Sequence, residues 1–136
     1  RVIACTQAPA PSLNADADAK RFTPDPNALT VYVVRRNWGD GRHFIKVQAD
    51  GGPAVDTLPN TMVRMKLKPG IHTVAFEFEG KRQSTSVEGK AGDLRFVRID
   101  GMVWSWKSSF EWAAEPEASI RERALKARLV ADVAVR

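Results

Sequence analysis

Hydrophobic and polar positions alternate most clearly between residues 57 and 78, TLPNTMVRMKLKPGIHTVAFEF. A period of two places successive side chains on opposite faces of a β-strand. The apolar members of this alternation are Val63, Met65, Leu67, Val74, Phe76 and Phe78. Pro69-Gly70 separates the two runs, and Pro followed by Gly is typical of a tight turn. The pattern therefore predicts an antiparallel hairpin whose apolar side chains face one core.

The polar positions of this stretch carry opposite charges on the two sides of the turn. Arg64, Lys66 and Lys68 precede it, and Glu77 and Glu79 follow it. In a hairpin these side chains would pair across the strands. Exposed pairs of this kind stabilise by only about 0.2–1 kcal/mol, so we expect them to select a register rather than to hold the fold.

Further short segments rich in β-branched and aromatic residues lie on both sides of this stretch. They cover residues 28–36, 43–48, 54–58, 83–87, 94–99 and 102–106. Turn signals rich in Gly, Pro and Asp separate several of them, at Asp50–Pro53, Gly89–Asp93 and Asp100–Gly101. Strands at this spacing predict an all-β fold, an antiparallel β-sandwich of seven to eight strands.

The last segment changes to a helical composition. Glu115-Pro116-Glu117 places Pro and acidic residues where a helix favours them, at its start. Residues 118–129 are mostly strong helix formers, and Leu125 and Leu129 would share one face. We expect a C-terminal α-helix packed on one side of the sheet. A helix lying in a membrane interface is the alternative, but the segment has few large apolar residues for that role.

Size and charge restrict the classes of function. The chain has 136 residues, which is typical of one domain, and 21 basic against 16 acidic residues give a net charge of +5. The basic residues are scattered rather than clustered with aromatic residues, which argues against a nucleic-acid partner. No apolar run approaches the roughly 20 residues that span a bilayer.

The first residues are similar to a bacterial lipoprotein signal. Val2-Ile3-Ala4-Cys5 resembles a lipobox, in which the cysteine is acylated; a chance Ala-Cys pair is the alternative. Thr6–Pro26 is rich in Ala, Pro and Asp, has no hydrophobic period, and is predicted to be a flexible tether. We therefore divide the chain into residues 1–26, a signal-peptide remnant with lipobox and tether, and residues 27–136, the folded domain. This organisation predicts a periplasmic protein that is lipid-anchored through Cys5, at the outer membrane.

Candidate chemistry is sparse. Cys5 is the only cysteine, which excludes an internal disulfide, and His43 and His72 are the only histidines. We expect His72 to hydrogen-bond the backbone of the adjacent turn. No zinc-ligand spacing, Gly-x-Ser-x-Gly motif or nucleotide-binding glycine loop is present. Five aspartates lie in or beside predicted turns, where Asp commonly bonds its own backbone: Asp40, Asp50, Asp56, Asp93 and Asp100. The sequence predicts no catalytic residue, no metal site and no cofactor.

Tryptophans give the chain its only candidate binding residues. Trp38 lies in a Gly-rich loop, and Trp104 and Trp106 would share one strand face. Core packing is the first interpretation of these side chains. Exposed, they would instead stack on sugar rings or contact a partner protein, which predicts a carbohydrate- or peptidoglycan-binding module as the alternative function.

The order of these elements resembles the DUF2846 family of bacterial lipoprotein-like domains, whose function is unknown. The matching positions between residues 28 and 130 are Tyr32, Arg35, Val47, Gly51, Leu58, Pro69, Gly70, His72, Gly92 and Phe96. The segment 57–78 is also similar to PEGA-type β modules of envelope proteins. The resemblance implies an exported β-sandwich with a lipid anchor and no established activity. We therefore expect a non-enzymatic envelope domain with a binding or structural role.

Overall fold

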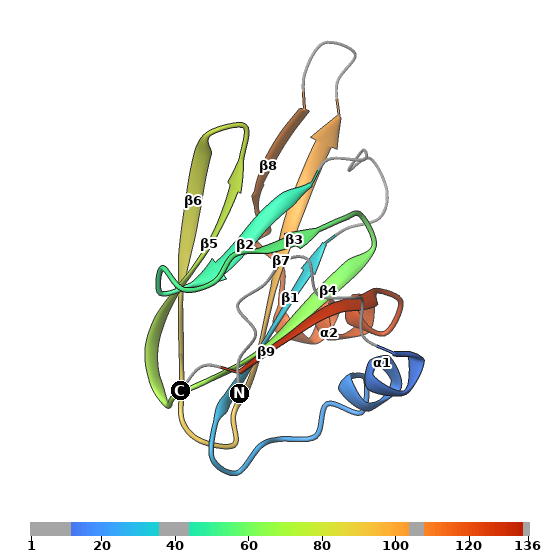
Figure 1. The fold of residues 1–136 in the computed structure, drawn as a ribbon, viewed down its shortest axis with the longest axis vertical. Helices are drawn as coiled ribbons and strands as arrows, with labels where there is room; N and C mark the ends of the chain where they lie inside the picture. The colour runs from blue at the N-terminus through green and yellow to red at the C-terminus, as the bar shows by residue number, and fades with distance from the viewer. Residues whose placement is uncertain (1–11, 36–43, 104–107, 135–136) are drawn as a thin grey trace.

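The computed structural model describes residues 12–35, 44–103 and 108–134 of the chain, and these form nine strands and two short helices. The strands are β1 Leu29–Arg35, β2 Ile45–Ala49, β3 Val55–Thr57, β4 Thr61–Leu67, β5 Gly70–Phe78, β6 Lys81–Gly89, β7 Leu94–Val103, β8 Ser108–Trp112 and β9 Arg128–Ala134. The helices are α1 Leu13–Ala19 and α2 Glu117–Ala124. One sheet has the order β8-β7-β1-β4-β9 and the other has the order β3-β2-β5-β6 (Figure 1). The predicted β-rich fold is confirmed. The five-stranded sheet is mixed rather than antiparallel as predicted, because β1 pairs with β7 and β4 pairs with β9 in parallel.

The two sheets share one apolar core, which explains the alternation in the sequence. Val31 and Val33 of β1 belong to the same buried cluster as Ile45 and Val47 of β2. The apolar positions of the stretch 57–78 also point inward, since Val63, Met65, Leu67, Val74 and Phe76 are members of this cluster and Phe78 packs against it. The predicted inward faces of both runs are therefore confirmed.

The predicted pairing of these runs is wrong, because β4 and β5 lie in different sheets. β4 pairs with β1 and β9, whereas β5 pairs with β2 and β6. Gly70 has φ 137°, a backbone conformation that favours glycine, where the chain crosses between the sheets. Alternation determines which face of a strand is buried, but it carries no information on the neighbouring strand.

The charge pairs expected across that hairpin are absent from the described ion pairs. Arg64 instead contacts Asp132 of β9, and Lys66 contacts Asp25. Arg64 is almost fully buried, since it lies on the outer face of the five-stranded sheet, under α1. Arg64 and Lys66 therefore face α1, β9 and the segment after α1 rather than β5.

The predicted tether contains a helix that packs on the domain. α1 begins after Ser12, whose hydroxyl accepts a hydrogen bond from the Ala15 amide at 3.1 Å. The Phe22 ring, 5 % exposed, lies 5.2 Å from the Tyr32 ring and 5.3 Å from the Phe96 ring. The prediction of an unstructured segment is thus wrong for this part, because burial of Phe22 against these two rings outweighs the polar composition of the segment. Residues 1–11 lie outside the described ranges.

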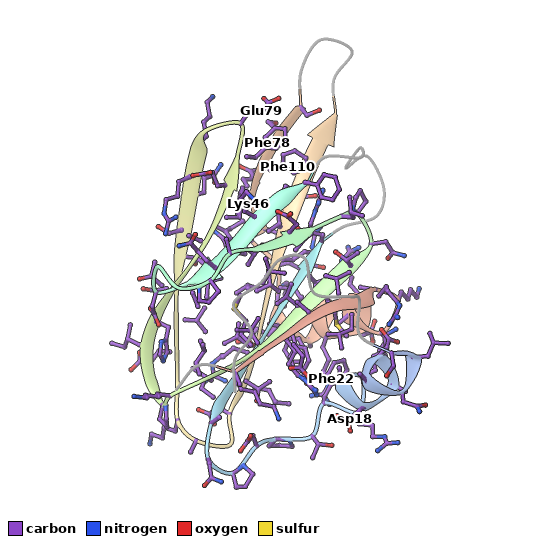
Figure 2. All side chains as sticks on the ribbon, viewed as in Figure 1. Asp18, Phe22, Lys46, Phe78, Glu79 and Phe110 are labelled. Carbon is purple, nitrogen blue, oxygen red and sulfur yellow. The ribbon has the colours of Figure 1, made fainter. Side chains whose placement is uncertain are left out.

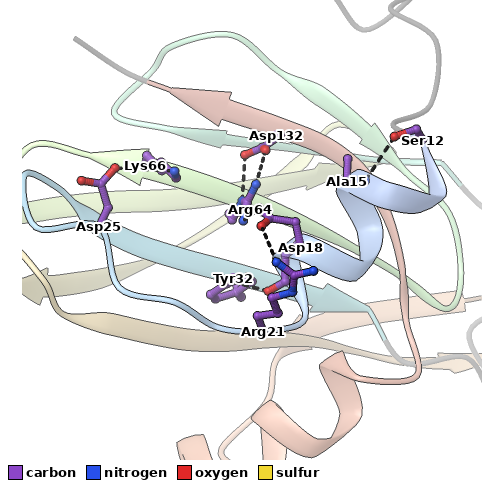
Figure 3. A network of polar contacts seen from close by, with 10 residues as sticks. Ser12, Ala15, Asp18, Arg21, Asp25, Tyr32, Arg64, Lys66 and Asp132 are labelled. Carbon is purple, nitrogen blue, oxygen red and sulfur yellow. Dashed lines mark hydrogen bonds and ion pairs between the residues drawn. The ribbon is translucent and has the colours of Figure 1, made fainter.

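Polar contacts fasten α1 to the sheet (Figure 3). Arg64 donates to both carboxylate oxygens of Asp132, at 3.0 and 2.5 Å, and lies 3.4 Å from an oxygen of Asp18 in α1. The Tyr32 hydroxyl donates to the Ala19 carbonyl at 3.1 Å. A bidentate arginine–carboxylate pair of this kind has fixed geometry, so it fixes the relative positions of β4 and β9 beneath the helix.

The C-terminal helix is shorter than predicted, and a strand follows it. α2 ends at Ala124, and β9 then runs parallel to β4. Leu129 is fully buried in this strand, whereas Leu125 is 50 % exposed, so the two leucines do not share a helix face. Backbone pairing with β4 outweighs the helix propensity of this segment. The expected packing of a helix against the five-stranded sheet does occur, through Ile120 and Ala124.

The chain also continues as strand where a turn was predicted. β7 extends through Asp100 and Gly101 to Val103, and these two residues pair with Glu111 and Phe110 of β8. The predicted strand 102–106 is therefore the end of β7, followed by residues 104–107 outside the described ranges. Cross-strand pairing explains why Asp-Gly does not form a turn here.

Candidate functional site

The predicted site residues cannot be placed in the described part of the chain. Cys5, the predicted lipid attachment site, and the tryptophans Trp38, Trp104 and Trp106 all lie outside it, as does His43. Their roles stay predictions. The described residues instead bring together a group of charged side chains that the sequence analysis did not single out.

Glu115, directly before α2, organises this group. One carboxylate oxygen accepts a hydrogen bond from Arg98 at 2.5 Å, and the other accepts from Ser119 at 2.5 Å and from Arg123 at 2.8 Å. Burial alone would raise the pKa of Glu115, but the hydrogen bonds from Ser119, Arg123 and Arg98 outweigh burial and lower it to about 2. Glu117 adds a further contact, because its carboxylate accepts from the Phe96 amide at 2.9 Å. The start of α2 is therefore held firmly on β7.

A hollow of about 590 Å³ lies beside this network, and we call it the basic hollow. Its lining residues are Arg35, Asn60, Ser119, Glu122, Arg123, Leu125 and Lys126. Three of these side chains are cationic and one is a carboxylate. They come from the end of β1, the turn between β3 and β4, and α2 with the residues that follow it. The hollow has the size of a small-molecule site.

Backbone contacts hold the rim of the hollow near β4. Asn60 has φ 61°, a conformation that Asn tolerates better than most residues. Its carbonyl accepts from the Arg128 amide at 2.9 Å, and Thr61 donates to the Leu58 carbonyl at 2.5 Å. The Leu58–Asn60 turn joins β3 of one sheet to β4 of the other.

Arg35 forms the buried wall of the basic hollow. Its side chain donates to the Thr57 carbonyl at 2.7 Å, and its guanidinium carbon lies 5.5 Å from the centre of the Phe110 ring. Thr57 is itself held by donating to the Ile45 carbonyl at 2.9 Å. Arg35 therefore contributes positive charge from a fixed position between the sheets.

The chemistry of the basic hollow favours binding over catalysis. Ser119, the one residue with a hydroxyl among the described residues that line it, donates to Glu115. A carboxylate with a pKa of about 2 is a weak base, so it does not activate this hydroxyl as a nucleophile. Lys126 has no ion pair or side-chain hydrogen bond with any described residue, and its charge is available to an anion. The arrangement is suited to holding a negatively charged group.

A smaller aromatic hollow lies where β5 and β6 meet β8, and Phe110, which lines it, also contacts Arg35 of the basic hollow. It measures about 180 Å³ and is lined by Phe76, Phe78, Glu79, Lys81, Gln83, Ser108, Ser109 and Phe110. The rings of Phe78 and Phe110 are 4.5 Å apart (Figure 2). Gln83 links the sheets, since its amide donates to the Phe110 carbonyl at 2.6 Å and its own carbonyl accepts from the Trp112 indole at 3.3 Å.

His72 has a structural role, as expected. Its Nε2 bonds the Lys68 carbonyl at 2.5 Å, which confirms the predicted contact with the turn backbone, and its Nδ1 bonds the Asp50 carboxylate. Both partners are acceptors, so the protonated ring satisfies both contacts at once. Burial alone would lower the pKa of His72, but the contacts with Asp50 and Lys68 outweigh burial and raise it. No ring nitrogen is left to exchange a proton with a substrate.

Some of the aspartates have the predicted role of bonding turn backbone. Asp50 accepts from the Thr73 amide at 2.9 Å and Asp93 accepts from the Lys90 amide at 2.8 Å. Asp56 and Asp100 lie in strands, where they pair with Lys46 and Arg98, so the turn interpretation is wrong for these two. Asp40 lies outside the described residues. Within the described ranges, no three or more His, Cys, Asp or Glu side chains are placed to hold a metal ion.

Comparison with known proteins adds no assignment. No protein-family model matches the chain, and a search of curated proteins finds no similar sequence. The site residues are therefore interpreted from their chemistry alone. The sequence offers one signal that could have indicated the basic hollow, the basic run from Arg121 to Lys126, but nothing in it places Arg35 or Asn60 nearby.

Proposed function

We propose that this chain is a non-catalytic binding domain of the bacterial cell envelope. The basic hollow carries the proposal, because two of its cations, Arg35 and Arg123, are held by hydrogen bonds. The hydroxyl among its described lining residues donates to a carboxylate too acidic to take its proton. A general base works best when its pKa lies near the operating pH. A binding site needs only fixed charges around a space of sufficient size, and both are present.

The finer architecture is part of the same proposal. The cluster shared by the two sheets supports a β-sandwich, and the Ile120 and Ala124 contacts support a helix covering its outer face. Such a domain presents loops and helix ends at its rims, where binding residues commonly lie. Arg35 and Asn60 occupy positions of this kind.

The envelope location is supported by the Val2–Cys5 motif and by the resemblance to DUF2846 domains. Among the described residues, neither helix is long and apolar enough to cross a bilayer. We expect the full-length protein, expressed in a bacterial host, to carry the mass of a lipid on Cys5 and to sediment with membranes. Cys5→Ser is the control. A mature protein without acyl mass would contradict this location.

Binding is tested by photo-crosslinking from the hollow itself. The full chain, with a photoreactive residue at position 60, is irradiated in bacterial envelope extract and its intact mass is measured. We expect a discrete small-molecule adduct at position 60 and none with the same residue at exposed position 84 on β6. Equal labelling at both positions would contradict a binding role for the hollow.

A second candidate function is glycan binding, favoured by the aromatic hollow. Its floor of phenylalanine rings and its rim of Glu79, Lys81 and serine hydroxyls combine the apolar and polar groups that sugars require. Trp104 and Trp106 follow β7 in the chain, so they are the predicted partners of such a site. Peptidoglycan fragments should then protect tryptophan fluorescence from quenching by iodide. Quenching that is unchanged by the fragments would remove this candidate.

A further inference from the structure

The cationic side chains of the basic hollow differ in how much of their bonding capacity the fold uses. Arg123 is oriented by the hydrogen bond from its Nε to Glu115, yet its side chain is 45 % exposed. Lys126, two residues beyond the end of α2, is exposed and has no ion-pair partner among the described side chains. An oriented guanidinium and an exposed lysine ammonium are both side chains that commonly bind oxyanions.

The size and lining of the hollow indicate more than a bare ion. A volume of about 590 Å³ is many times that of a phosphate group, so a bound ion alone would leave most of it filled with water. Leu125 lies between Arg123 and Lys126 in the sequence. It is 50 % exposed and provides an apolar contact. The carboxylate of Glu122 lines the same space and would repel a ligand with several negative charges.

We propose that the basic hollow binds a small organic oxyanion, a phosphate ester or carboxylate, through Arg123 and Lys126, with Leu125 against the apolar part of the ligand. This inference rests on the proposed binding function and names the ligand class for it. The Asn60 amide side chain and the Ser119 segment line the remaining wall. Glu122 restricts the ligand to one anionic group, which disfavours nucleic acids and polyanionic polymers.

The test is an NMR titration of the ¹⁵N-labelled full chain with phenyl phosphate, benzoate and inorganic phosphate. We expect saturable shifts of the amides of Asn60, Ser119 and Leu125, with phenyl phosphate or benzoate binding more tightly than inorganic phosphate. Lys126→Met should weaken binding about tenfold, because it removes a charge-assisted hydrogen bond. Lys90→Met, which removes the same charge at an exposed turn far along the chain, should leave the affinity unchanged.

Several results would overturn the inference. These are shifts that do not saturate, equal weakening by both lysine variants, or binding to phosphatidylglycerol vesicles without binding to the soluble ester. Leu125→Ser tests the apolar contact by itself, because it should reduce the preference for phenyl phosphate over inorganic phosphate. An unchanged preference counts against that contact. If the titration fails while photo-crosslinking at position 60 succeeds, the ligand class is wrong and the binding function stands. Failure of both removes the proposed function.

Discussion

At the scale of single residues, the stability of this domain depends on a few charged side chains removed from water. Arg98, Arg64 and Arg35 are each less than 10 % exposed, and each has a specific partner. A buried charge is tolerated only while its partners remain, since an unpaired one retains the full cost of desolvation. These arginines therefore act on the basic hollow and on the helical layer indirectly, by holding their partners in fixed positions.

Glu115→Gln tests this dependence. The substitution removes the closer of the two carboxylates that pair with the buried Arg98 guanidinium and leaves Asp100 at 3.3 Å. We expect the free energy of unfolding at pH 7 to fall by about 1.5–3 kcal/mol, which is typical of a hydrogen bond to a charged group. Urea denaturation measures the change. Glu111→Gln, an exposed position on β8, should stay within about 0.5 kcal/mol of the wild type.

The pH dependence of Glu115 has a definite sign. Its folded pKa of about 2 is below the ordinary value of 4.5, so its contribution is complete above pH 4.5 and is lost as the pH falls towards 2. The stability difference between wild type and Glu115→Gln should therefore shrink over this window. A difference that stays constant from pH 7 to pH 2 would show that the carboxylate charge is not what holds Arg98.

The contribution of His72 to stability should depend on pH in the opposite direction, and at higher pH. Its folded pKa is raised, so the stability it adds is complete below the unfolded pKa and is lost as the pH rises through the folded value. We expect the melting temperature to fall from pH 6 to pH 9 more steeply in wild type than in His72→Gln. Parallel profiles for the two proteins would contradict the imidazolium between Asp50 and Lys68.

At the scale of elements, local pattern predicts burial better than it predicts pairing. The inward faces of β4 and β5 follow directly from alternation, but their sheet partners depend on β1, β2 and β9, which are distant in the sequence. The sequence around β9 predicts a helix because it is rich in Ala, Leu and Arg. Pairing with β4 makes the segment a strand instead. α1 itself has few apolar residues, and Phe22, which follows the helix, provides the buried aromatic contact of this segment.

Phe22→Ala tests whether this N-terminal segment belongs to the domain. The ring is buried against Tyr32 and Phe96, so its removal should cost about 3–5 kcal/mol. Phe44→Ala is the matched control, because Phe44 is 63 % exposed and should cost less than about 1 kcal/mol. Chemical denaturation of both variants measures the difference, and equal small losses would favour the tether instead.

A pair of leucines distinguishes the strand β9 from the predicted helix. Leu129→Ala should destabilise by about 2–5 kcal/mol, whereas Leu125→Ala should have a much smaller effect. A continuous helix with both leucines on one face would make the two losses similar. Melting curves of the two variants therefore test where α2 ends.

At the scale of the whole molecule, the fold brings the end of β1, the β3–β4 turn and the region after α2 to one place. Sequence alone could not predict the basic hollow, because Arg35, Asn60 and Lys126 are separated by long stretches of chain and each is unremarkable in isolation. The sequence does predict the apolar core that supports it. The predicted tryptophan and lipid sites belong to parts of the chain outside the described residues.

The central claim is that the domain holds a ligand without transforming it. The most direct measurement incubates the full-length protein with bacterial envelope extract and quantifies small molecules by mass spectrometry, both in the extract and on the recovered protein. We predict that an anionic compound is retained on the wild type, is retained less by Lys126→Met, and is released chemically unchanged. Consumption of an extract component over time that requires the domain, with appearance of a product, would contradict the account.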